Sequence, residues 1–517
     1  MLYQIQIQER EYWWGGTTVD GCSMPFDQDT NLEHDFQVNT PNQTMPLFLS
    51  STGRCIWSES PFRVKIADGM FEIEGEEVTV ECFGDCLADA YKGAMRKYFP
   101  PSGEYLEETF FNVPQYNTWM HLVYDQNQEG VLQYARDIVA NGFKPGILMI
   151  DEGWHIDYGI WKFDLLKFPD PKAMVEQLHS MGFKVMLWVV PFVRPDGKFF
   201  VKHTDPRANT EKLENYFLRS ESGDVAITKW WNGRSAVFDM TKECDRNLLD
   251  SKLISLMEEY GIDGFKFDGG TVDCYTDSSI ASKGQVNRDY TPHERNAAWN
   301  DFGTKYKFHE FKDTYKGGGK RVIQRIRDRE HTWDHEGLNT FVPNALAQGI
   351  IGHPFVCPDM VGGGEWIYRE FNIPADQELF VRMAQASALF PMMQFSWAPW
   401  EALDTAHLSY VKQAHDLHCD FSEIIRDLVA AAYETGEPIM RYLEYNYPHC
   451  GYEKVNDVFM LGDEYLGAPV LAQGQLVKKI PLPEGTWLGF DGNEYVGGRT
   501  LDLPVTIETL PWFRKRQ

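Results

Sequence analysis

The chain has 517 residues, enough for about two to four domains, and 49 basic against 76 acidic residues give it a net charge of −27. A chain this acidic repels phosphate backbones and anionic lipid, so we expect neither nucleic acid nor a membrane surface as a partner. No apolar run reaches transmembrane length, and the first residues lack the basic and apolar regions of a signal peptide. These features predict a cytoplasmic protein, although a leader already removed would leave the same sequence.

The first hundred residues show the alternation of antiparallel strands. Tyr3, Ile5 and Ile7 alternate with glutamines, and the run 62–85 contains three short alternating segments, broken at Asp68-Gly69 and Gly75-Glu76. Apolar and polar residues in strict alternation, separated by Gly-containing pairs, are typical of β-hairpins. We predict an N-terminal β-sandwich over residues 1–112.

Apolar runs and amphipathic segments alternate from about residue 115 onwards. The expected strands are 118–125, 146–151, 184–193, 235–240, 262–268, 321–328, 353–359 and 391–397, and a helical insertion is expected before Gly317–Gly319. Seven or eight strand–helix units in about 300 residues favour a (β/α)8 barrel with long loops over residues 113–428. A doubly wound sheet is the alternative, but G-x-G-x-x-G does not follow a strand here.

The last part of the chain returns to β structure. The runs 457–471, 478–490 and 500–515 are rich in strand-forming residues and are separated by Gly- and Pro-containing turns. We predict a C-terminal β-sandwich domain over residues 429–517. The fold class is thus α/β: a (β/α)8 TIM barrel flanked by two β domains.

Carboxylates end several of the predicted barrel strands. These acids are Asp151, Asp239, Asp268, Asp328 and Asp359. Five carboxylates at the catalytic rim of one barrel repel each other, which indicates a site that uses them. Either binding of a divalent metal or acid–base and nucleophilic chemistry on a sugar would use them.

The sequence gives the metal alternative little support. His331 and His335 have a zinc-like spacing, but H-E-x-x-H is absent and no third ligand accompanies them. Cys82 and Cys86 are the only close pair among nine cysteines, and one pair does not make a zinc site. The run KGGGKR at 316–321 is not a phosphate-binding loop, because the spacing to a Lys-Ser/Thr pair is missing. We expect no metal and no cofactor.

The ordered motifs of the barrel and of the C-terminal region resemble glycoside hydrolase family 31. They are LMIDEGW at 148–154, KFDGG at 266–270, the run 333–363 ending in PDMVGG, RMAQASALFPMMQFS at 382–396 and LPEGTW at 482–487. Within the family, KFDGG and PDMVGG are most similar to the branch that includes the myogenesis-regulating glycosidase. The resemblance covers nearly the whole chain and implies a retaining α-glycosidase that uses two aspartates.

Each catalytic aspartate is placed on its own motif. The family nucleophile ends the strand that reads KFDGG here, which is Asp268. The acid/base lies five residues before a Trp-Asp pair, here Trp333-Asp334, which gives Asp328. This chain departs from the usual Gly-Asp-Asn pattern, because Arg327 and Arg329 flank Asp328. A general acid must hold a proton, so we expect both arginine side chains to point away from Asp328.

The resemblance also implies substrate-binding residues: Asp151, Arg325 and Asp359, with Trp188 and Trp231 as candidates for an aromatic wall. The alternative for any single tryptophan is core packing. The family Arg-Asn-His after the last strand is missing, and the chain has MQFSW instead. Ser396 or Trp397 is expected in its place.

The expected glycone is α-galactose. MIDEGW resembles the Asp-Asp-Gly-Trp strand of related α-galactosidase families, so Asp151 and Glu152 are expected at the O4 and O6 hydroxyls and Trp154 at the C6 face. Lys266 resembles the Lys-x-Asp of those families, which implies a contact to ring hydroxyls and to the nucleophile. The alternative is that Glu152 packs and Lys266 only neutralises the acidic rim. An α-glucosidase or α-xylosidase, an inactive sugar-binding relative and a metal-dependent barrel enzyme stay open. The expected partner is an oligosaccharide or glycoside, and a homo-oligomer is compatible with the sequence.

Overall fold

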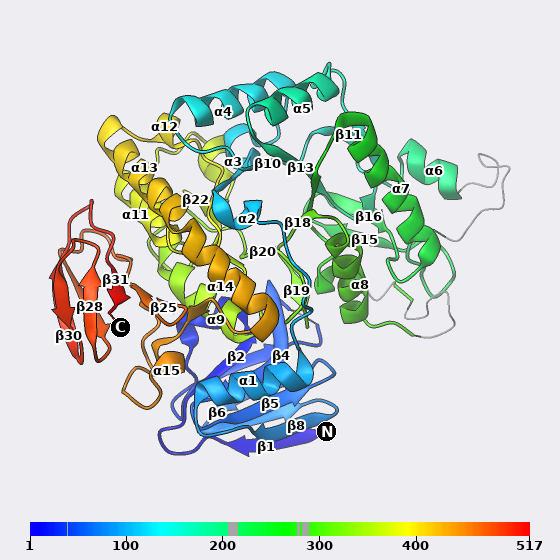
Figure 1. Ribbon diagram of the computed structural model, residues 1–517. Coiled ribbons are helices and arrows are strands. Elements are labelled where there is room, and N and C mark those ends of the chain that lie inside the picture. Colours follow the sequence, from blue (N-terminus) through cyan, green and yellow to red (C-terminus); the bar gives the residue numbers. More distant parts are fainter. Residues whose placement is uncertain (39, 205–215, 277–279, 282–288, 517) are drawn as a thin grey trace. The chain divides into compact units, whose positions relative to one another are not determined.

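The computed structural model describes the chain except residues 39, 205–215, 277–279, 282–288 and 517 (Figure 1). The chain forms two compact units. We call one the outer unit, because it contains both ends of the sequence, and the other the nucleophile unit, because it contains Asp268, the nucleophile that the sequence predicts. The outer unit comprises 1–37, 41–116 and 316–517, and the nucleophile unit comprises 38–40 and 117–315. Among the described residues, none of the helices is both long and apolar enough to cross a membrane.

Two antiparallel sheets form the N-terminal part of the outer unit. One has the order β1 (Leu2–Gln6), β7 (Met70–Glu74), β6 (Arg63–Ala67) and β3 (Leu32–Asp35). The other contains β2 (Trp13–Thr17), β4 (Gln43–Ser50), β5 (Arg54–Ser58) and β8 (Val78–Cys82). The predicted turn at Asp68-Gly69 joins β6 to β7, and both residues have positive φ, 51° and 70°. Phe71 lies 5.2 Å from both Trp13 and Phe48, ring centre to ring centre, so aromatic side chains fill this core.

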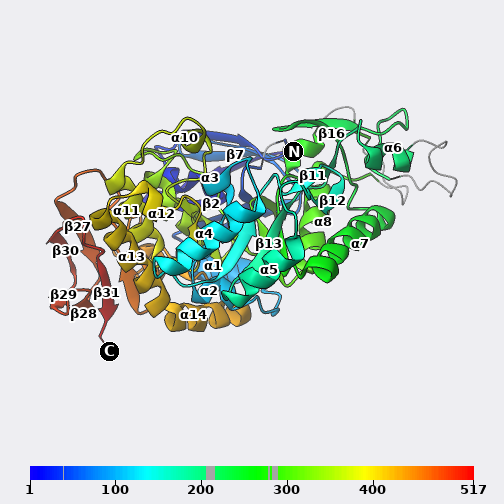
Figure 2. The same ribbon diagram turned by 90° about the horizontal axis from the view of Figure 1, so that it is seen from above.

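The C-terminal part of the outer unit is again β structure. One sheet has the order β24 (Met440–Arg441), β25 (Phe459–Leu461), β26 (Tyr465–Gly467), β31 (Trp512–Lys515), β28 (Thr486–Gly489) and β29 (Glu494–Val496). A second pairs β27 (Val477–Leu482) with β30 (Arg499–Pro504). Trp487, Ile480 and Phe513 are buried between them. In both views these strands lie beside α11 (Gln377–Ser387) and α13 (Thr405–Asp420) (Figures 1 and 2).

Parallel strands separated by helices make up the centre of the nucleophile unit. β10 (Ile147–Ile150), β13 (Lys184–Val189), β17 (Gly264–Phe267) and β18 (Phe308–Phe311) pair in this order, all parallel. The helices that alternate with them are α4 (Gln128–Ala140), α5 (Pro171–Ser180), α7 (Glu243–Tyr260) and α8 (Pro292–Thr304). The strands are almost entirely buried and mostly apolar, as expected of parallel strands covered on both faces.

The outer unit contributes further parallel strands with their helices. β9 (Gln115–Asn117) pairs with β23 (Gln394–Phe395), β23 with β22 (Met360–Val361), and β20 (Gln324–Arg325) with β21 (Val356–Cys357). The helices here are α9 (Phe341–Ile350), α11, α13 and α14 (Ser422–Thr435). The parallel strand–helix alternation of both units is that of the predicted (β/α)8 barrel, flanked by β domains at both ends of the sequence.

Three predicted elements are wrong in detail. The run 235–240 was expected as a barrel strand, but β16 (Gly233–Val237) pairs antiparallel with β15 (Ile227–Trp230) and β14 (Phe192–Val193). A two-residue turn at Trp231-Asn232 makes this segment a hairpin, so Asp239 does not end a barrel strand. The first strand is β9 rather than 118–125, of which Trp119–Leu122 is helical (α3). The expected helical insertion contains the strand β18.

Candidate active site

Asp268 follows the last residue of β17 and is held at both carboxylate oxygens. Its backbone N–H donates to the Val189 carbonyl at 2.9 Å, which continues the strand pairing. The Trp188 indole N–H donates to Oδ2 at 2.9 Å and the Gly269 N–H donates to Oδ1 at 2.9 Å. Lys312 Nζ lies 3.5 Å from Oδ2. These donors and the cation orient the carboxylate and favour its ionised, nucleophilic form.

The two glycines after Asp268 are required by the backbone. Gly269 and Gly270 have φ of +60° and +63°, a region that glycine enters without the strain of a side chain. A Cβ at Gly269 would lie 2.6 Å from the Phe192 ring, and one at Gly270 would lie 2.5 Å from the Trp299 ring. The Gly-Gly pair therefore lets the chain turn away directly behind Asp268.

A buried ion pair lies one residue layer below Asp268. Lys266 Nζ is 2.7 Å from Asp151 Oδ2, and both side chains are almost fully buried. Lys266 lies opposite Trp188 in the strand register, so the ion pair and the indole share one face of the sheet. Lys266 was expected at the nucleophile; the structure pairs it with Asp151, and Lys312 is the cation near Asp268. The sequence prediction missed Lys312 because it missed β18.

Glu152 joins two hairpins of the nucleophile unit. Its Oε1 accepts hydrogen bonds from the Tyr158 hydroxyl and from Asn232 Nδ2. Tyr158 lies between β11 (His155–Asp157) and β12 (Ile160–Phe163), and Asn232 lies in the turn between β15 and β16. Burial raises the pKa of Glu152 to about 7; the Tyr158 hydrogen bond opposes this shift, and the charges of Asp151 and Asp268 add to it. Glu152 therefore changes its protonation near neutral pH.

Aromatic residues form a small cavity beside Trp188. Its lining includes Trp154, His155, Tyr158, Trp161 and Trp188. The Trp154 indole N–H donates to the Trp188 carbonyl at 2.8 Å. Both tryptophans are buried, so they take part in core packing and also line the cavity. Trp231, in contrast, is 54% exposed at its hairpin turn. Of the predicted aromatic wall, only Trp231 lies on the surface.

Asp328 lies in the outer unit, three residues after β20. Arg325 Nη2 is 2.9 Å from Asp328 Oδ1, and Arg325 Nη1 donates to Asp359 Oδ1. The Arg329 backbone N–H donates to Asp359 Oδ2 at 2.7 Å. Asp359 is fully buried, and burial raises its pKa against the opposing pull of the Arg325 guanidinium. One guanidinium thus serves two carboxylates, so this triad carries a net charge of −1 when both acids are ionised.

The two arginines that flank Asp328 differ in their surroundings. Arg327 forms an ion pair with Glu336. Arg329 is buried, and burial lowers its pKa to about 10. A third arginine, Arg325, is the one whose guanidinium contacts Asp328 among the described ion pairs, and the sequence prediction did not foresee this contact.

Trp397 is buried rather than presented to solvent. Its ring centre lies 5.4 Å from His331 and 6.0 Å from Phe380, and the Arg369 guanidinium lies 5.8 Å above it. His331 Nδ1 faces the Gly362 carbonyl at 2.9 Å, and its Nε2 accepts the Asp376 N–H at 2.8 Å. Both nitrogens of His331 are thus engaged with the backbone, and the zinc-like His331–His335 spacing has an ordinary packing explanation.

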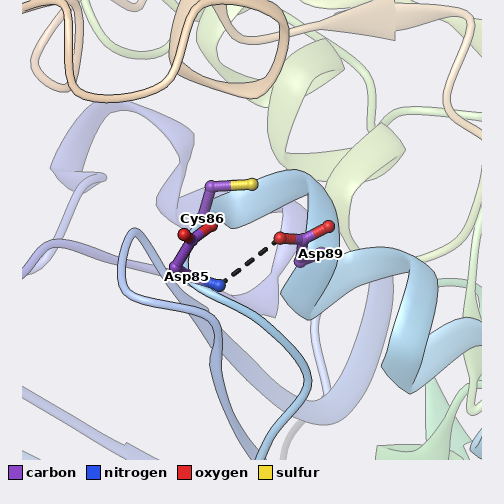
Figure 3. A group of neighbouring side chains, drawn as sticks. All are labelled: Asp85, Cys86 and Asp89. Atoms are coloured by element: carbon purple, nitrogen blue, oxygen red, sulfur yellow. Dashed lines mark hydrogen bonds between the residues drawn. The ribbon is translucent and has the colours of Figure 1, made fainter.

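One group of potential metal ligands lies elsewhere in the described chain, at the start of α1 (Leu87–Tyr98) (Figure 3). Asp85, Cys86 and Asp89 each offer a ligand atom within 4.8 Å of the others. The Asp85 N–H donates to Asp89 Oδ2 at 3.4 Å, and Cys86 is the N-cap residue of the helix. An aspartate in the first helical turn is favoured by the helix dipole alone, so Asp89 has a structural reason for its place.

Comparison of the sequence with known protein families identifies the family of this chain. The model of the glycosyl hydrolases family 31 TIM-barrel domain matches residues 113–421, and that of the family's C-terminal domain matches 436–517. The myogenesis-regulating glycosidase of Mus musculus is 29% identical over 454 residues, which cover 84% of this chain and 60% of that protein. Alpha-glucosidase 2 of Bacillus thermoamyloliquefaciens is 25% identical over 423 residues, 76% of this chain and 51% of that protein.

Solved structures agree on the fold. The GH31 dextranase FjDex31A of Flavobacterium johnsoniae, complexed with glucose, superposes with a TM-score of 0.84 at 18% identity and covers 99% of this chain and 66% of that one. The chain spans about 60% or less of the length of the two sequence relatives described above. Because the barrel-domain model alone matches more than half of the chain, the chain belongs to glycoside hydrolase family 31.

Proposed function

We propose that this chain is an exo-acting, retaining α-glycosidase that hydrolyses terminal α-linked hexosides. The observation that carries the proposal is Asp268, a carboxylate at the carboxyl end of a parallel barrel strand, held by Trp188, Gly269 and Lys312. Catalytic groups of (β/α)8 enzymes sit at this end of the strands. Membership of family 31 supports a glycosidase reaction there.

In the proposed reaction, Asp268 attacks the anomeric carbon while the bond to the leaving oxygen breaks. Asp328 gives its proton to that oxygen, so the aglycone leaves as an alcohol. Water then attacks the anomeric carbon of the glycosyl-enzyme, Asp328 takes a proton from it, and the Asp268 carboxylate is released. Two inversions at one carbon leave the product with the α configuration of the substrate.

Asp328 must take up a proton before the first step; the adjacent Arg325 guanidinium opposes this, and the negative charge of Asp359 favours it. The triad of Arg325, Asp328 and Asp359 has a net charge of −1 when both acids are ionised, so one added proton neutralises it. Arg325 contacts both acids, but Asp359 is fully buried, whereas the Asp328 side chain is 27% exposed. Asp328 is therefore the member of the triad that can exchange a proton with a substrate.

We propose α-galactose as the glycone. Asp151 and Glu152 are adjacent acids after β10, and both lie in the same unit as Asp268. In such a site the carboxylates accept hydrogen bonds from the axial O4 hydroxyl of galactose. Glucose has an equatorial O4, so the carboxylates would lose this hydrogen bond and glucosides would react more slowly. The second candidate is an α-glucosidase or α-xylosidase, because an α-glucosidase is among the relatives.

A panel of nitrophenyl α-glycosides tests the glycone. It should contain the galactoside, glucoside, xyloside and N-acetylgalactosaminide, each measured as kcat/KM. We expect the galactoside to be cleaved fastest. Faster cleavage of the glucoside would overturn the galactose proposal and leave the two-aspartate mechanism standing. Binding of the sugars without any turnover would support an inactive relative, and activity lost on chelation and restored by Mg²⁺ would support a metal-dependent enzyme.

Product stereochemistry and two variants test the mechanism. Proton NMR should show the α-anomer first, and a β-anomer would exclude retention. Asp268→Ala should lose activity on every substrate. Asp328→Ala should lose about 10²–10⁴-fold on substrates with poor leaving groups, and azide should restore its turnover of a nitrophenyl glycoside as the α-glycosyl azide. Azide that replaces the missing carboxylate in Asp268→Ala inverts the anomeric carbon once and gives the β-glycosyl azide. An α-glycosyl azide from Asp268→Ala, or none from Asp328→Ala, would therefore contradict the two roles.

A further inference from the structure

The segment between β22 and α11 exposes several apolar side chains of the outer unit. It contains the one-turn helix α10 (Ile367–Glu370). Trp366 is 37% exposed, Ile367 44%, Phe371 65% and Ile373 40%. We call these four residues the apolar loop face. Four exposed large apolar side chains within eight positions differ from the scattered single ones that are normal on a protein surface.

Contacts on the other side of α10 hold this segment in place. The Tyr368 ring lies 5.8 Å from His331, edge to face. Arg369 lies over the buried Trp397 ring and its Nη2 is 3.5 Å from Glu401. The Ile373 N–H donates to the Tyr368 carbonyl at 2.8 Å. The apolar loop face is therefore the outer side of an anchored turn, and Trp397 acts as its support.

The same segment lies directly against Asp328. The N–H groups of Gly364 and Glu365 donate to the Arg329 carbonyl at 2.9 Å and 3.2 Å. A Cβ at Gly364 would lie only 2.9 Å from Asp328 Oδ1, so the glycine allows this close approach. Trp366 is two residues further along the chain, which places its Cα within about 7 Å of the Cα of Gly364.

We propose that the apolar loop face binds the aglycone of the substrate, with Trp366 as its main contact. This inference rests on the proposed function, because it takes Asp328 as the acid/base. The acid/base donates its proton to the oxygen that joins sugar and aglycone, so the aglycone begins at the atom that Asp328 contacts. An indole next to that point presents a flat apolar surface to the group that leaves.

The chemistry of the face defines the class of aglycone. Glu365 and Glu370 flank the apolar residues, and the whole chain carries a net charge of −27, so an anionic aglycone is repelled. An uncharged group with a flat apolar face fits, which can be the C–H face of a second sugar or an aryl group. The face exposes on the order of 400 Å², about half of what each partner buries in a stable protein interface, so a second copy of the chain fits less well.

Substrates that share a glycone and differ in the leaving group test the proposal. The probes are the α-glycosyl fluoride, the nitrophenyl α-glycoside and an α-linked disaccharide of the glycone that the panel selects. For Trp366→Ala we expect kcat/KM to fall at least about tenfold on the nitrophenyl glycoside, the disaccharide or both, and to stay within about twofold on the fluoride, which has no aglycone ring. The substrate whose kcat/KM falls most shows whether the face binds an aryl group or a second sugar. Trp366→Phe should recover most of the loss.

A matched control is Tyr105→Ala, since Tyr105 is also in the outer unit, 60% exposed and packed against another ring, that of Tyr433. It should leave all three substrates unchanged. Equal losses on all three substrates in Trp366→Ala, or no loss on any, would overturn the proposal. A change in sedimentation coefficient with unchanged kinetics would assign the face to self-association instead. A wild-type protein that cleaves neither galactosyl nor glucosyl fluoride would overturn the proposed function, and this inference with it.

Discussion

The two lysines near the proposed nucleophile have different surroundings and should respond differently to substitution. Lys266 is buried against Asp151, whereas the Lys312 side chain is 22% exposed and lies 3.5 Å from Asp268. Removing one partner of a buried pair leaves an uncompensated charge, which costs about 3–5 kcal/mol. We expect Lys266→Gln to lower the free energy of unfolding by that amount and Lys312→Gln to change it by less than about 1 kcal/mol.

Lys312→Gln, which should hardly change stability, should have a clear effect on kinetics. Without its positive charge the Asp268 carboxylate loses a stabilising neighbour, so kcat/KM should fall about 10–100-fold while the urea unfolding curve is unchanged. Lys312→Arg keeps the charge and should recover part of the rate. A Lys312→Gln protein with wild-type kinetics would show that this lysine only neutralises the rim.

Glu152 gives a second prediction, on the pH dependence of stability. Burial raises its pKa in the folded protein to about 7, above the ordinary carboxyl value of 4.5. A raised pKa means that its contribution to stability is fully present below pH 4.5 and is lost as the pH rises to about 7. In Glu152→Gln, which keeps an acceptor for Tyr158 and Asn232, this loss should disappear.

The measurement is the unfolding free energy of both proteins in urea between pH 4.5 and 8. As the pH rises, the unfolding free energy of Glu152→Gln should increase relative to that of the wild type. The total change should be about 3 kcal/mol at most and should be complete near pH 8. A constant difference between the two proteins over this range would contradict a raised pKa for Glu152.

Single residues of the candidate site could be predicted where a motif marks them. Asp268 is marked by an apolar strand before it and two glycines after it, and Asp151 by its place after a strand of four apolar residues. Tyr158, Asn232 and Lys312 could not be placed in the same way. Their role depends on which loops come together after folding, and the sequence around each resembles an ordinary turn or strand end.

At the scale of elements, the turn behind β17 depends on glycine for two separable reasons. Gly270 has φ of +63° and a neighbouring ring 2.5 Å from the position of a Cβ, whereas Gly492 has φ of +78° and nothing within 4 Å. Gly492→Ala should therefore cost only the left-handed strain, about 1 kcal/mol. Gly270→Ala should cause the same strain and also displace the Trp299 ring. Together these should lower the free energy of unfolding by roughly 2–4 kcal/mol.

Thermal and urea unfolding of the two variants give the comparison directly. Because Gly270 adjoins the proposed nucleophile, its variant should also lose activity, whereas Gly492→Ala should keep it. Equal destabilisation of the two variants would mean that Trp299 moves aside without cost.

Secondary structure was predicted correctly where the pattern of apolar and polar residues extends over a long continuous stretch of sequence. The N-terminal hairpin at Asp68-Gly69 and helices such as α4 and α5 follow from alternation and amphipathicity. The prediction failed for β16, β18 and β9, each five residues or fewer. Short apolar runs have no period of their own, so their partner strands decide whether they join a parallel barrel or an antiparallel hairpin.

At the scale of the whole molecule, the net charge of −27 opposes the compact state through repulsion among surface carboxylates. Salt shortens the range of this repulsion, to about 10 Å at 0.1 M and 3 Å at 1 M. At pH 8 we expect the melting temperature to rise by several degrees between about 0.02 M and 0.5 M NaCl. The same series near pH 5, close to the pI of about 4.9, is the control and should show little change. A rise of equal size at both pH values would point to a general salting effect rather than screening.

The ion pair between Asp151 and Lys266 joins two strands, β10 and β17, that are not neighbours in the sheet. Neither residue can be replaced alone without leaving its partner charged and buried, so a lineage that changes one must pass through a poorly folding intermediate or change both at once. In natural variants and in mutational libraries, positions 151 and 266 should therefore covary. A shift of sugar preference that involves Asp151 would then require a second substitution, at position 266.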